Sequence, residues 1–397
     1  METRYDFDKL VIRCGTNCVK WDERTQEDII PLWVADMDFE VLPEITEALR
    51  KRVEHGVFGY AIVGDSYYES IINWFRRRHN WEIRREWIQY TTGVVPAVSA
   101  VIKALTMPGE RVLILSPVYN CFFSSIRNNG CEVLESPLKP STSISHLTPT
   151  YEVDWEDFER KCADEKTTVF LLCNPHNPAG RVWTAEELNR MNEICLKHGV
   201  KVISDEIHGE LIMPGYQFKP FASVSKACAA NSVICSSPSK SFNTAGLQMA
   251  HIICQNAEWR RRIDRAININ EICDVNPFAP LAVEAAYNKG DQWIDELNAY
   301  LYGNYQALCT FMAEELPELK VFRLEGTYLV WIDITATGMT SDQFTHRLFH
   351  EGRVWVNSGT MYGEKTGEGY IRINIATQRA RLMEGLRRMR EFRTSRC

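Results

Sequence analysis

Three short polar segments carry residues that could do chemistry together. Each follows an apolar run of strand length: NPHNPAG (174–180) follows TTVFLLC, DEIH (205–208) follows KVIS, and SPSK (237–240) follows NSVICS. Taken singly, they have ordinary explanations: a turn, a capping or ion-paired carboxylate, and a solvated loop lysine. Ligands of open α/β sheets bind outside the carboxyl ends of the strands. Because the segments end consecutive strands, we expect them to form one site.

The residue types in these segments fit the binding of an aldehyde cofactor with a pyridine ring and a phosphate. A lysine amine forms an imine with the aldehyde. A carboxylate facing the ring nitrogen keeps it protonated, so that the ring accepts electrons. Hydroxyl groups and helix N-terminal amides bind a phosphate dianion. A fourth segment, TTGVVPAV (91–98), predicts a strand-to-helix turn that could supply such amides, although alone it could be a plain turn.

The elements that must position these segments are strands alternating with helices. The continuously apolar runs RVLILS, TTVFLLC, VKVISDE, NSVICSS and AHIICQ are typical of parallel strands covered on both faces. Between two of them, residues 184–197 have a helical pattern that begins with a capping box of Thr184 and Glu187. This alternation predicts an α/β sheet with mainly right-handed crossovers.

The pattern of expected strands and helices divides the chain into three parts. Residues 46–285 predict a large cofactor-binding domain, and residues 286–397 predict a smaller α+β domain. The smaller domain would contain a long helix at about 291–315, the strands TYLVWIDI and GYIRINIA, and a basic final helix. Residues 1–45 are irregular and are expected to associate with the small domain while contacting both. A cleft between the two domains follows from this organisation.

Composition excludes several classes of partner. The net charge is −7 and no sustained basic stripe is present, so nucleic acid is not an expected partner. No run approaches the roughly 18 apolar residues of a membrane span. The thirteen cysteines form no CxxC pair and are odd in number. They are therefore expected to be free thiols in a reducing cytoplasm, and no metal site is predicted.

Read together, the motifs are similar to those of a known family. RCGTNCVKWD, PLWVADMDF, GYAIVGDSYYESIINWF, TTGVVPAV, NPHNPAGRVWT, SDEIHGEL, SPSKSFNTAGLQMAHI and YIRINIAT occur in this order over nearly the whole chain. The set resembles fold-type I pyridoxal-5′-phosphate (PLP) enzymes of the aspartate aminotransferase superfamily. More narrowly, it resembles their cystathionine β-lyase (C–S lyase) branch of the MalY/PatB type. The resemblance implies a mainly parallel seven-stranded sheet sandwiched by helices, a smaller α+β C-terminal domain, and a homodimer.

The same resemblance assigns the residues around the cofactor ring. Lys240 would hold PLP as a Schiff base, and Asp205 would pair with the pyridine nitrogen. Asn177 would bind the phenolic oxygen, and Tyr119 would stack on the ring. Residues expected at the phosphate are Gly93, Val94, Val95, Ser237 and Ser239, together with Tyr60, which would reach across the dimer from the partner subunit.

The substrate residues implied by the resemblance are Arg372, Trp33, Asn177 and Tyr119. Arg372 lies in the alternating strand YIRIN, and its planar guanidinium suits the α-carboxylate of an amino acid. Trp33 would border the substrate pocket, although a packed indole is an alternative. Asp36 and Asp38 in the same segment could be helix caps or turn formers.

Two positions depart from the aspartate aminotransferases. His208 stands three residues after Asp205, where those enzymes have a tyrosine that bonds the phenolic oxygen. An imidazole could make a similar hydrogen bond, and a structural histidine is the alternative. Gln248 stands where many members have a phosphate-binding arginine. Both departures match the C–S lyase branch.

The function implied by the resemblance is β-elimination from L-cystathionine or a related S-substituted cysteine. Lys240 would remove the Cα proton, and a thiolate would leave, giving pyruvate and ammonia. An aminotransferase is the main alternative, because it uses the same lysine, aspartate and arginine. A regulatory protein on an enzyme fold is less favoured, since Lys240, Asp205, Asn177 and Arg372 are all intact. The preferred thiol side chain and the pathway stay open.

Overall fold

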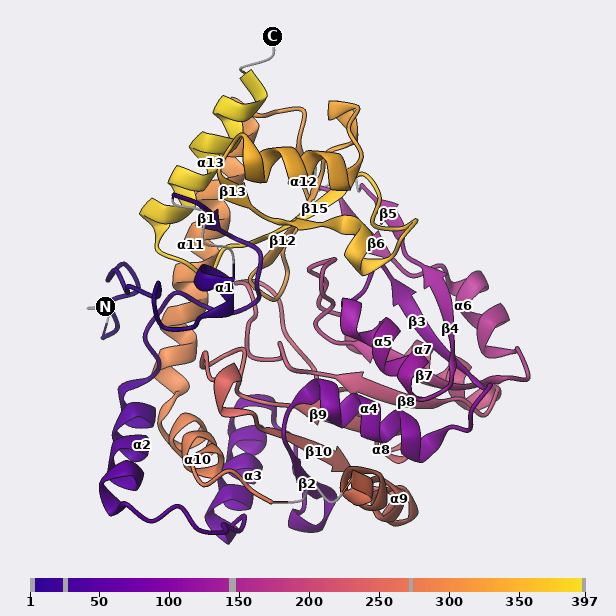
Figure 1. The fold of residues 1–397 in the computed structure, drawn as a ribbon. Helices are drawn as coiled ribbons and strands as arrows, with labels where there is room; N and C mark the ends of the chain where they lie inside the picture. The colour runs from indigo at the N-terminus through magenta and orange to yellow at the C-terminus, as the bar shows by residue number, and fades with distance from the viewer. Residues whose placement is uncertain (1–3, 24–27, 143–147, 271–273, 395–397) are drawn as a thin grey trace.

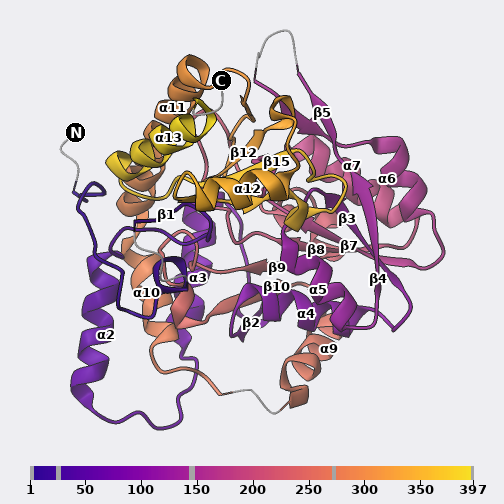
Figure 2. The same cartoon turned by 45° about the horizontal axis from the view of Figure 1, so that its top comes forward.

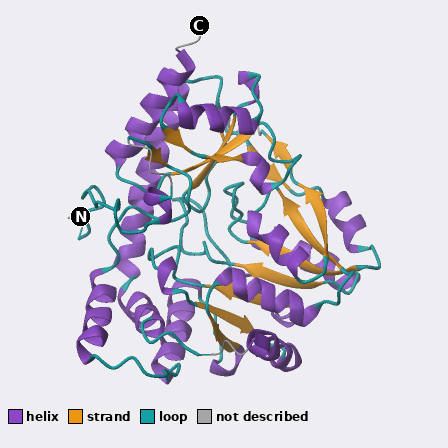
Figure 3. Cartoon of the chain, in the orientation of Figure 1, coloured by secondary structure: helices purple, strands orange, loops and turns teal. Residues whose placement is uncertain are grey.

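The computed structural model describes residues 4–23, 28–142, 148–270 and 274–394. Its centre is a seven-stranded sheet, as predicted, visible beside the helices that cover it (Figures 1 and 3). The strand order is β2 (Ile88–Thr91), β10 (Ala250–Cys254), β9 (Ser232–Ser236), β8 (Lys201–Asp205), β7 (Thr167–Cys173), β3 (Arg111–Ser116) and β4 (Glu132–Pro137).

The sheet is mainly parallel, and β10 is the exception to the sequence prediction. Strands β4, β3, β7, β8 and β9 run parallel, whereas β10 is antiparallel to both β9 and β2. Residues Ala250–Cys254 of the run AHIICQ are continuously buried because helices cover this part of the sheet, and burial alone does not indicate strand direction. The chain returns from β9 to β10 through the loop that carries Lys240, without a crossover helix.

Each face of the sheet has its own apolar core, because successive side chains of a strand point to opposite faces. In β3, Val112 and Ile114 pack on one face, and Leu113 and Leu115 pack on the other. The first face is covered by α4 (Val94–Leu105), α5 (Asn120–Asn128) and α9 (Ala257–Ile267). The second is covered by α3 (Asp65–His79), α6 (Trp155–Cys162), α7 (Ala185–Lys197), α8 (Lys226–Ala230) and α10 (Ala279–Lys289). The predicted capping box of α7 is present.

A second, four-stranded antiparallel sheet forms the C-terminal part of the fold (Figure 2). Its order is β11 (Lys320–Val321), β12 (Leu329–Asp333), β15 (Tyr370–Asn374) and β14 (Asn357–Ser358). It lies with helices α11 (Asp291–Glu315), α12 (Ser341–His350) and α13 (Arg379–Thr394), which confirms an α+β arrangement here. Strands β5 (Lys139–Ser141) and β6 (Thr150–Glu152) form a separate ladder.

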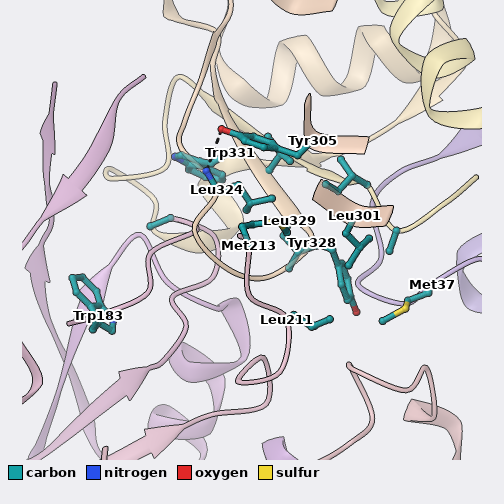
Figure 4. Packing of buried hydrophobic residues seen from close by; sticks show 14 of the residues in the cluster. Met37, Trp183, Leu211, Met213, Leu301, Tyr305, Leu324, Tyr328, Leu329 and Trp331 are labelled. Atoms are coloured by element: carbon teal, nitrogen blue, oxygen red, sulfur yellow. Dashed lines mark hydrogen bonds between the residues drawn. The ribbon is translucent and has the colours of Figure 1, made fainter. Parts of the chain in front are cut away.

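The N-terminal segment contacts both parts of the molecule. After α1 (Val19–Asp22), strand β1 (Ile30–Pro31) pairs with β13 (Val354–Trp355) of the C-terminal part. Farther along, Asn243, in the loop after β9, exchanges hydrogen bonds with the backbone of Met37. Met37 belongs to the buried cluster shown in part in Figure 4, which also contains Leu211, Tyr328 just before β12, and Leu329 of β12.

The predicted domain boundaries fall inside helices. The boundary after residue 45 lies in α2 (Pro43–His55), and the boundary after residue 285 lies in α10. The division into 1–45, 46–285 and 286–397 therefore stays a prediction. None of the helices in the described ranges combines the length and apolar character needed to cross a membrane.

Candidate active site

A cavity of about 360 Å³ lies at the carboxyl ends of β7, β8 and β9. Its size is within the range of small-molecule and cofactor sites. The register pairs Cys173 at the end of β7 with Asp205 at the end of β8, so the segments that follow these strands meet. Most of the predicted site residues line this one cavity: Trp33, Gly93, Val94, Val95, Tyr119, Asn177, Asp205, His208, Ser239, Lys240 and Arg372.

Lys240 lies in the loop between β9 and β10 and projects into the cavity. Its Nζ donates a hydrogen bond to the carbonyl oxygen of Ala35 at 2.6 Å. Burial lowers the pKa of Lys240 to about 8; Arg372 acts in the same direction, whereas Asp36 and Asp205 oppose it. A minority of this amine is therefore neutral near physiological pH, much more than at the usual pKa of lysine, and the neutral form is the one that attacks an aldehyde or takes a proton.

Two adjacent carboxyl groups at the end of β8 have different surroundings. Asp205 lines the cavity, and one of its oxygens accepts the N–H of Ile207 at 3.1 Å. Burial raises the pKa of Asp205 to about 7, so a cation placed against it would stabilise its charged form. Glu206 does not line the cavity, and it accepts hydrogen bonds from the N–H of Phe221 and the hydroxyl of Ser204.

Arg372 comes from β15 of the small sheet, so the two parts of the fold meet at the cavity. Its side chain is 3% exposed; Nη1 donates to Asn177 Oδ1 at 3.2 Å, and Nη2 donates to the Trp33 carbonyl at 2.9 Å. The guanidinium lies over the ring of Tyr362 at 4.7 Å from its centroid. Among the described residues Nε has no hydrogen-bond partner, although it is buried. An anionic acceptor such as a carboxylate would satisfy it.

His208 and Tyr119 add neutral polar groups to the cavity wall. Burial lowers the pKa of His208 well below its usual value, so the imidazole is neutral. Its Nδ1 is buried without a hydrogen-bond partner in the described part of the chain. Tyr119 directly precedes α5, and burial raises the pKa of its phenol far above 10. Its hydroxyl therefore stays protonated and can donate a hydrogen bond.

The start of α4 forms one end of the cavity. Gly93 is the N-cap residue and provides no side-chain cap, so the first N–H groups of the helix are free to bind another acceptor. The positive end of the helix dipole favours an anion there. Thr92, Ser239 and Gln248 line the same cavity. This end is suited to a phosphate bound by amides and hydroxyls.

Two predicted phosphate ligands lie elsewhere in the single chain. The hydroxyl of Ser237 donates to the Met249 carbonyl and accepts the N–H of Ser239, and Ser237 does not line the cavity. A direct phosphate contact by Ser237 stays a prediction that this arrangement disfavours. Tyr60 is 95% exposed and also lies outside the cavity, as a residue that serves another subunit would.

Several lining residues were not found from the sequence. Asn357 comes from the small sheet, where it is paired with Arg372 in the β14–β15 ladder, and Tyr362 ends the short 3-10 helix Gly359–Tyr362 that follows β14. Cys121 lies at the start of α5 and interacts with Tyr119. Only strand register and loop path bring these residues to the cavity, and neither has a motif as a signal.

The cavity fits a PLP molecule by its own chemistry. It combines an amine of lowered pKa, a buried carboxylate, an uncapped helix N-terminus and two buried nitrogen atoms without partners in the described residues. These groups match the aldehyde, the ring nitrogen, the phosphate and the anionic oxygens of the cofactor and an amino acid. Within the described part of the chain, no three His, Cys, Asp or Glu side chains gather closely enough to hold a metal ion.

Comparison with known proteins agrees with this chemistry. The profile of the family described as aminotransferase class I and II matches residues 27–389. Cystathionine beta-lyase PatB of Bacillus subtilis (strain 168) is 40% identical over 389 residues, which cover 97% of this chain and 99% of the relative. Protein MalY of Escherichia coli (strain K12) is 32% identical, with 96% and 97% covered. The crystal structure of cystalysin from Treponema denticola, which contains PLP, superposes with a TM-score of 0.91 at 32% identity and covers 98% of this chain and 99% of its own.

The chain therefore belongs to the aminotransferase class I and II family, whose fold is PLP fold type I. Its cofactor is PLP, and its relatives within the family place it among the carbon–sulfur lyases.

Proposed function

We propose that the protein cleaves the Cβ–S bond of L-cystathionine or related S-substituted L-cysteines, giving a thiol, pyruvate and ammonia. The observation that carries this proposal is that Lys240 and Arg372 line the same cavity, in a chain that is 40% identical to a cystathionine β-lyase. When the guanidinium of Arg372 binds the α-carboxylate of the substrate, the α-carbon is positioned for proton removal by the amine of Lys240.

When bound, PLP supplies an aldehyde that condenses with amines and a protonated ring that accepts an electron pair from the substrate α-carbon. Asp205 would keep a positive charge on the ring nitrogen. Burial disfavours the ionised form of its carboxyl group, and a cationic partner stabilises that form. Lys240 Nζ takes the proton from the substrate Cα, and its lowered pKa keeps part of the amine neutral for this task.

Other residues of the cavity orient the reactants. Arg372 binds the α-carboxylate through its planar fork, while Asn177 and the Trp33 carbonyl fix the orientation of the guanidinium. Asn177 and neutral His208 would offer hydrogen bonds to the phenolic oxygen of the cofactor, and Ser239 with the α4 amides would hold its phosphate. The protonated Tyr119 hydroxyl is available as a hydrogen-bond donor in the cavity.

The working unit is a homodimer with shared active sites. Tyr60 is supported as an intersubunit residue by its 95% exposure and by its exposed apolar neighbours Val57, Phe58 and Ile62. Mixing inactive Lys240→Ala protein with Tyr60→Phe protein tests this proposal. Heterodimers carry one site with both wild-type residues, so activity above that of either parent supports sharing, and strictly additive activity contradicts it.

The protein acts in the cytoplasm. This is supported by its cysteines, which are free at every described position and mostly buried. Cys273 and Cys397 lie outside the described residues. A fusion to a compartment-specific reporter in the native host checks the location.

The activity itself is tested with PLP-loaded protein and S-methyl-L-cysteine or L-cystathionine, without a keto acid. Thiol, pyruvate and ammonia are expected in equal amounts. No thiol, combined with amino transfer once a keto acid is added, would replace the lyase by an aminotransferase.

A further inference from the structure

The segment 33–39 contacts the lysine and the arginine of the cavity through its backbone. The Trp33 carbonyl accepts hydrogen bonds from Arg372 Nη2 at 2.9 Å and from Asn357 at 3.1 Å. The Ala35 carbonyl accepts from Lys240 Nζ at 2.6 Å and from the Tyr328 hydroxyl at 2.9 Å. The position of these two carbonyl groups therefore affects both the substrate-binding guanidinium and the reactive amine.

The opposite side of this segment is held by ion pairs. Lys20 Nζ lies 2.9 Å from Asp38 Oδ2, and the side chains of both residues are fully buried. Arg13 contacts Asp36 at 2.6 Å and Asp38 at 2.8 Å. The Trp21 indole N–H donates to Asp38 at 2.9 Å. We call Arg13, Lys20, Trp21, Asp36 and Asp38 the N-terminal ionic cluster.

The carboxyl group of Asp38, at the centre of this cluster, is charged at neutral pH. Burial alone would raise the pKa of Asp38, but Lys20, Trp21 and Arg13 lower it to about 2. Buried ion pairs contribute little net stability compared with apolar residues of the same size, whereas they impose a specific geometry. Their role here is therefore better sought in geometry than in stability.

Packing alone does not hold the segment in place. A second cavity, of about 460 Å³, is lined by Lys20, Trp21, Trp355 and Arg381 beside the cluster. Trp355 stacks on Trp33, with ring centroids 4.1 Å apart and planes 13° from parallel. Trp33 lines the first cavity, so this indole pair separates the two spaces. Hydrogen bonds from the Asn374 amide to the carbonyl groups of Val34 and Asp36 also hold the backbone of the segment, and the ion pairs add contacts at the side chains of Asp36 and Asp38.

We propose that Arg13 and Lys20 are positioning residues that act through Asp36 and Asp38 to hold the Trp33 and Ala35 carbonyl groups against Arg372 and Lys240. The cluster thereby sets the affinity for the amino-acid substrate without touching it. This inference rests on the proposed function for the role of Arg372, but its test does not require turnover.

The test measures binding of L-alanine, an amino acid without a leaving group, to the PLP-loaded protein by the change in visible absorbance. Lys20→Met is expected to raise Kd about tenfold while the cofactor stays bound, since a misplaced Arg372 loses part of one charge-assisted hydrogen bond. Lys20→Arg keeps the charge and should restore most of the affinity. Lys9→Met is the matched control: its ion pair with Glu40 is on the surface of the same region, with side chains 55% and 61% exposed.

A second variant covers the case in which Lys20→Met fails to load the cofactor. Asp36→Asn removes the ion pair between Asp36 and the guanidinium of Arg13 but leaves the pair between Lys20 and Asp38. The side chain of Asp36 is 23% exposed. This variant should fold and raise Kd about threefold. The proposal is overturned if both Lys20→Met and Asp36→Asn bind L-alanine with the wild-type Kd. If Lys20→Met does not bind PLP, a wild-type Kd in Asp36→Asn alone overturns it. If the wild-type protein binds alanine but releases no thiol from S-methylcysteine, the proposed function fails while this test still stands.

Discussion

Replacing Arg372 by alanine removes the group that we expect to bind the substrate α-carboxylate. The guanidinium is 3% exposed and has fixed partners in Asn177 and Trp33, so it is preorganised for the incoming anion. Two hydrogen bonds between charged groups contribute about 1.5–3 kcal/mol each, which corresponds to a loss of about 10²–10⁴ in kcat/KM. Arg372→Lys keeps the charge but not the fork, and should lose about half of that free energy.

The assay compares S-methyl-L-cysteine with its α-carboxamide, which lacks the negative charge. The wild-type protein should prefer the acid by about 10²–10⁴ in kcat/KM, whereas Arg372→Ala should show little preference. Thermal unfolding and the visible absorbance of bound PLP check that each variant is folded and loaded. If Arg372→Ala slows both substrates by the same factor, Arg372 does not bind the carboxylate and the reasoning is refuted.

Three further outcomes follow from the structure. The rate of PLP capture by the cofactor-free protein should rise with pH to a plateau, with a midpoint near pH 8. Burial lowers the pKa of Lys240 to about 8, and only the neutral amine attacks the aldehyde. Stopped-flow absorbance measures this rate, and a midpoint near pH 10 would contradict the prediction. Asp205→Asn should lower kcat by at least about 10²-fold. The matched control Glu206→Gln lies outside the cavity and should keep most of the activity. Equal losses in the two variants would argue against Asp205 as the partner of the ring nitrogen. Thr184→Ala should cost about 1 kcal/mol in urea unfolding through the lost cap of α7, with kcat unchanged.

The sequence was most informative where chemistry follows a buried strand. Asp205 is the last residue of β8, and Asn177 and Lys240 follow β7 and β9; a continuous apolar run marks each of these strands. Because parallel strands end at one edge of the sheet, three local patterns were enough to predict one site. The same runs could not give the direction of β10, since burial on both faces is independent of strand direction.

The sequence was least informative where the site depends on long-range geometry. Asn357 reaches the cavity through the register of β14 against β15, and Tyr362 reaches it through the short 3-10 helix after β14; no local pattern encodes either placement. From the sequence, Asp36 and Asp38 could have been caps or turn formers, but in the structure they pair with Arg13 and Lys20. Ion pairs between irregular segments depend on the folded path of the chain, so they are seen only in three dimensions.

The central claim is that Lys240 carries the cofactor. Reduction of the PLP-loaded protein with borohydride, followed by peptide mapping, tests it most directly. The account predicts one pyridoxyl group per chain on the peptide that contains Lys240, and a Lys240→Ala protein that is not labelled and releases no pyruvate. Labelling of a different lysine, or pyruvate release by the Lys240→Ala protein at the wild-type rate, would contradict the account.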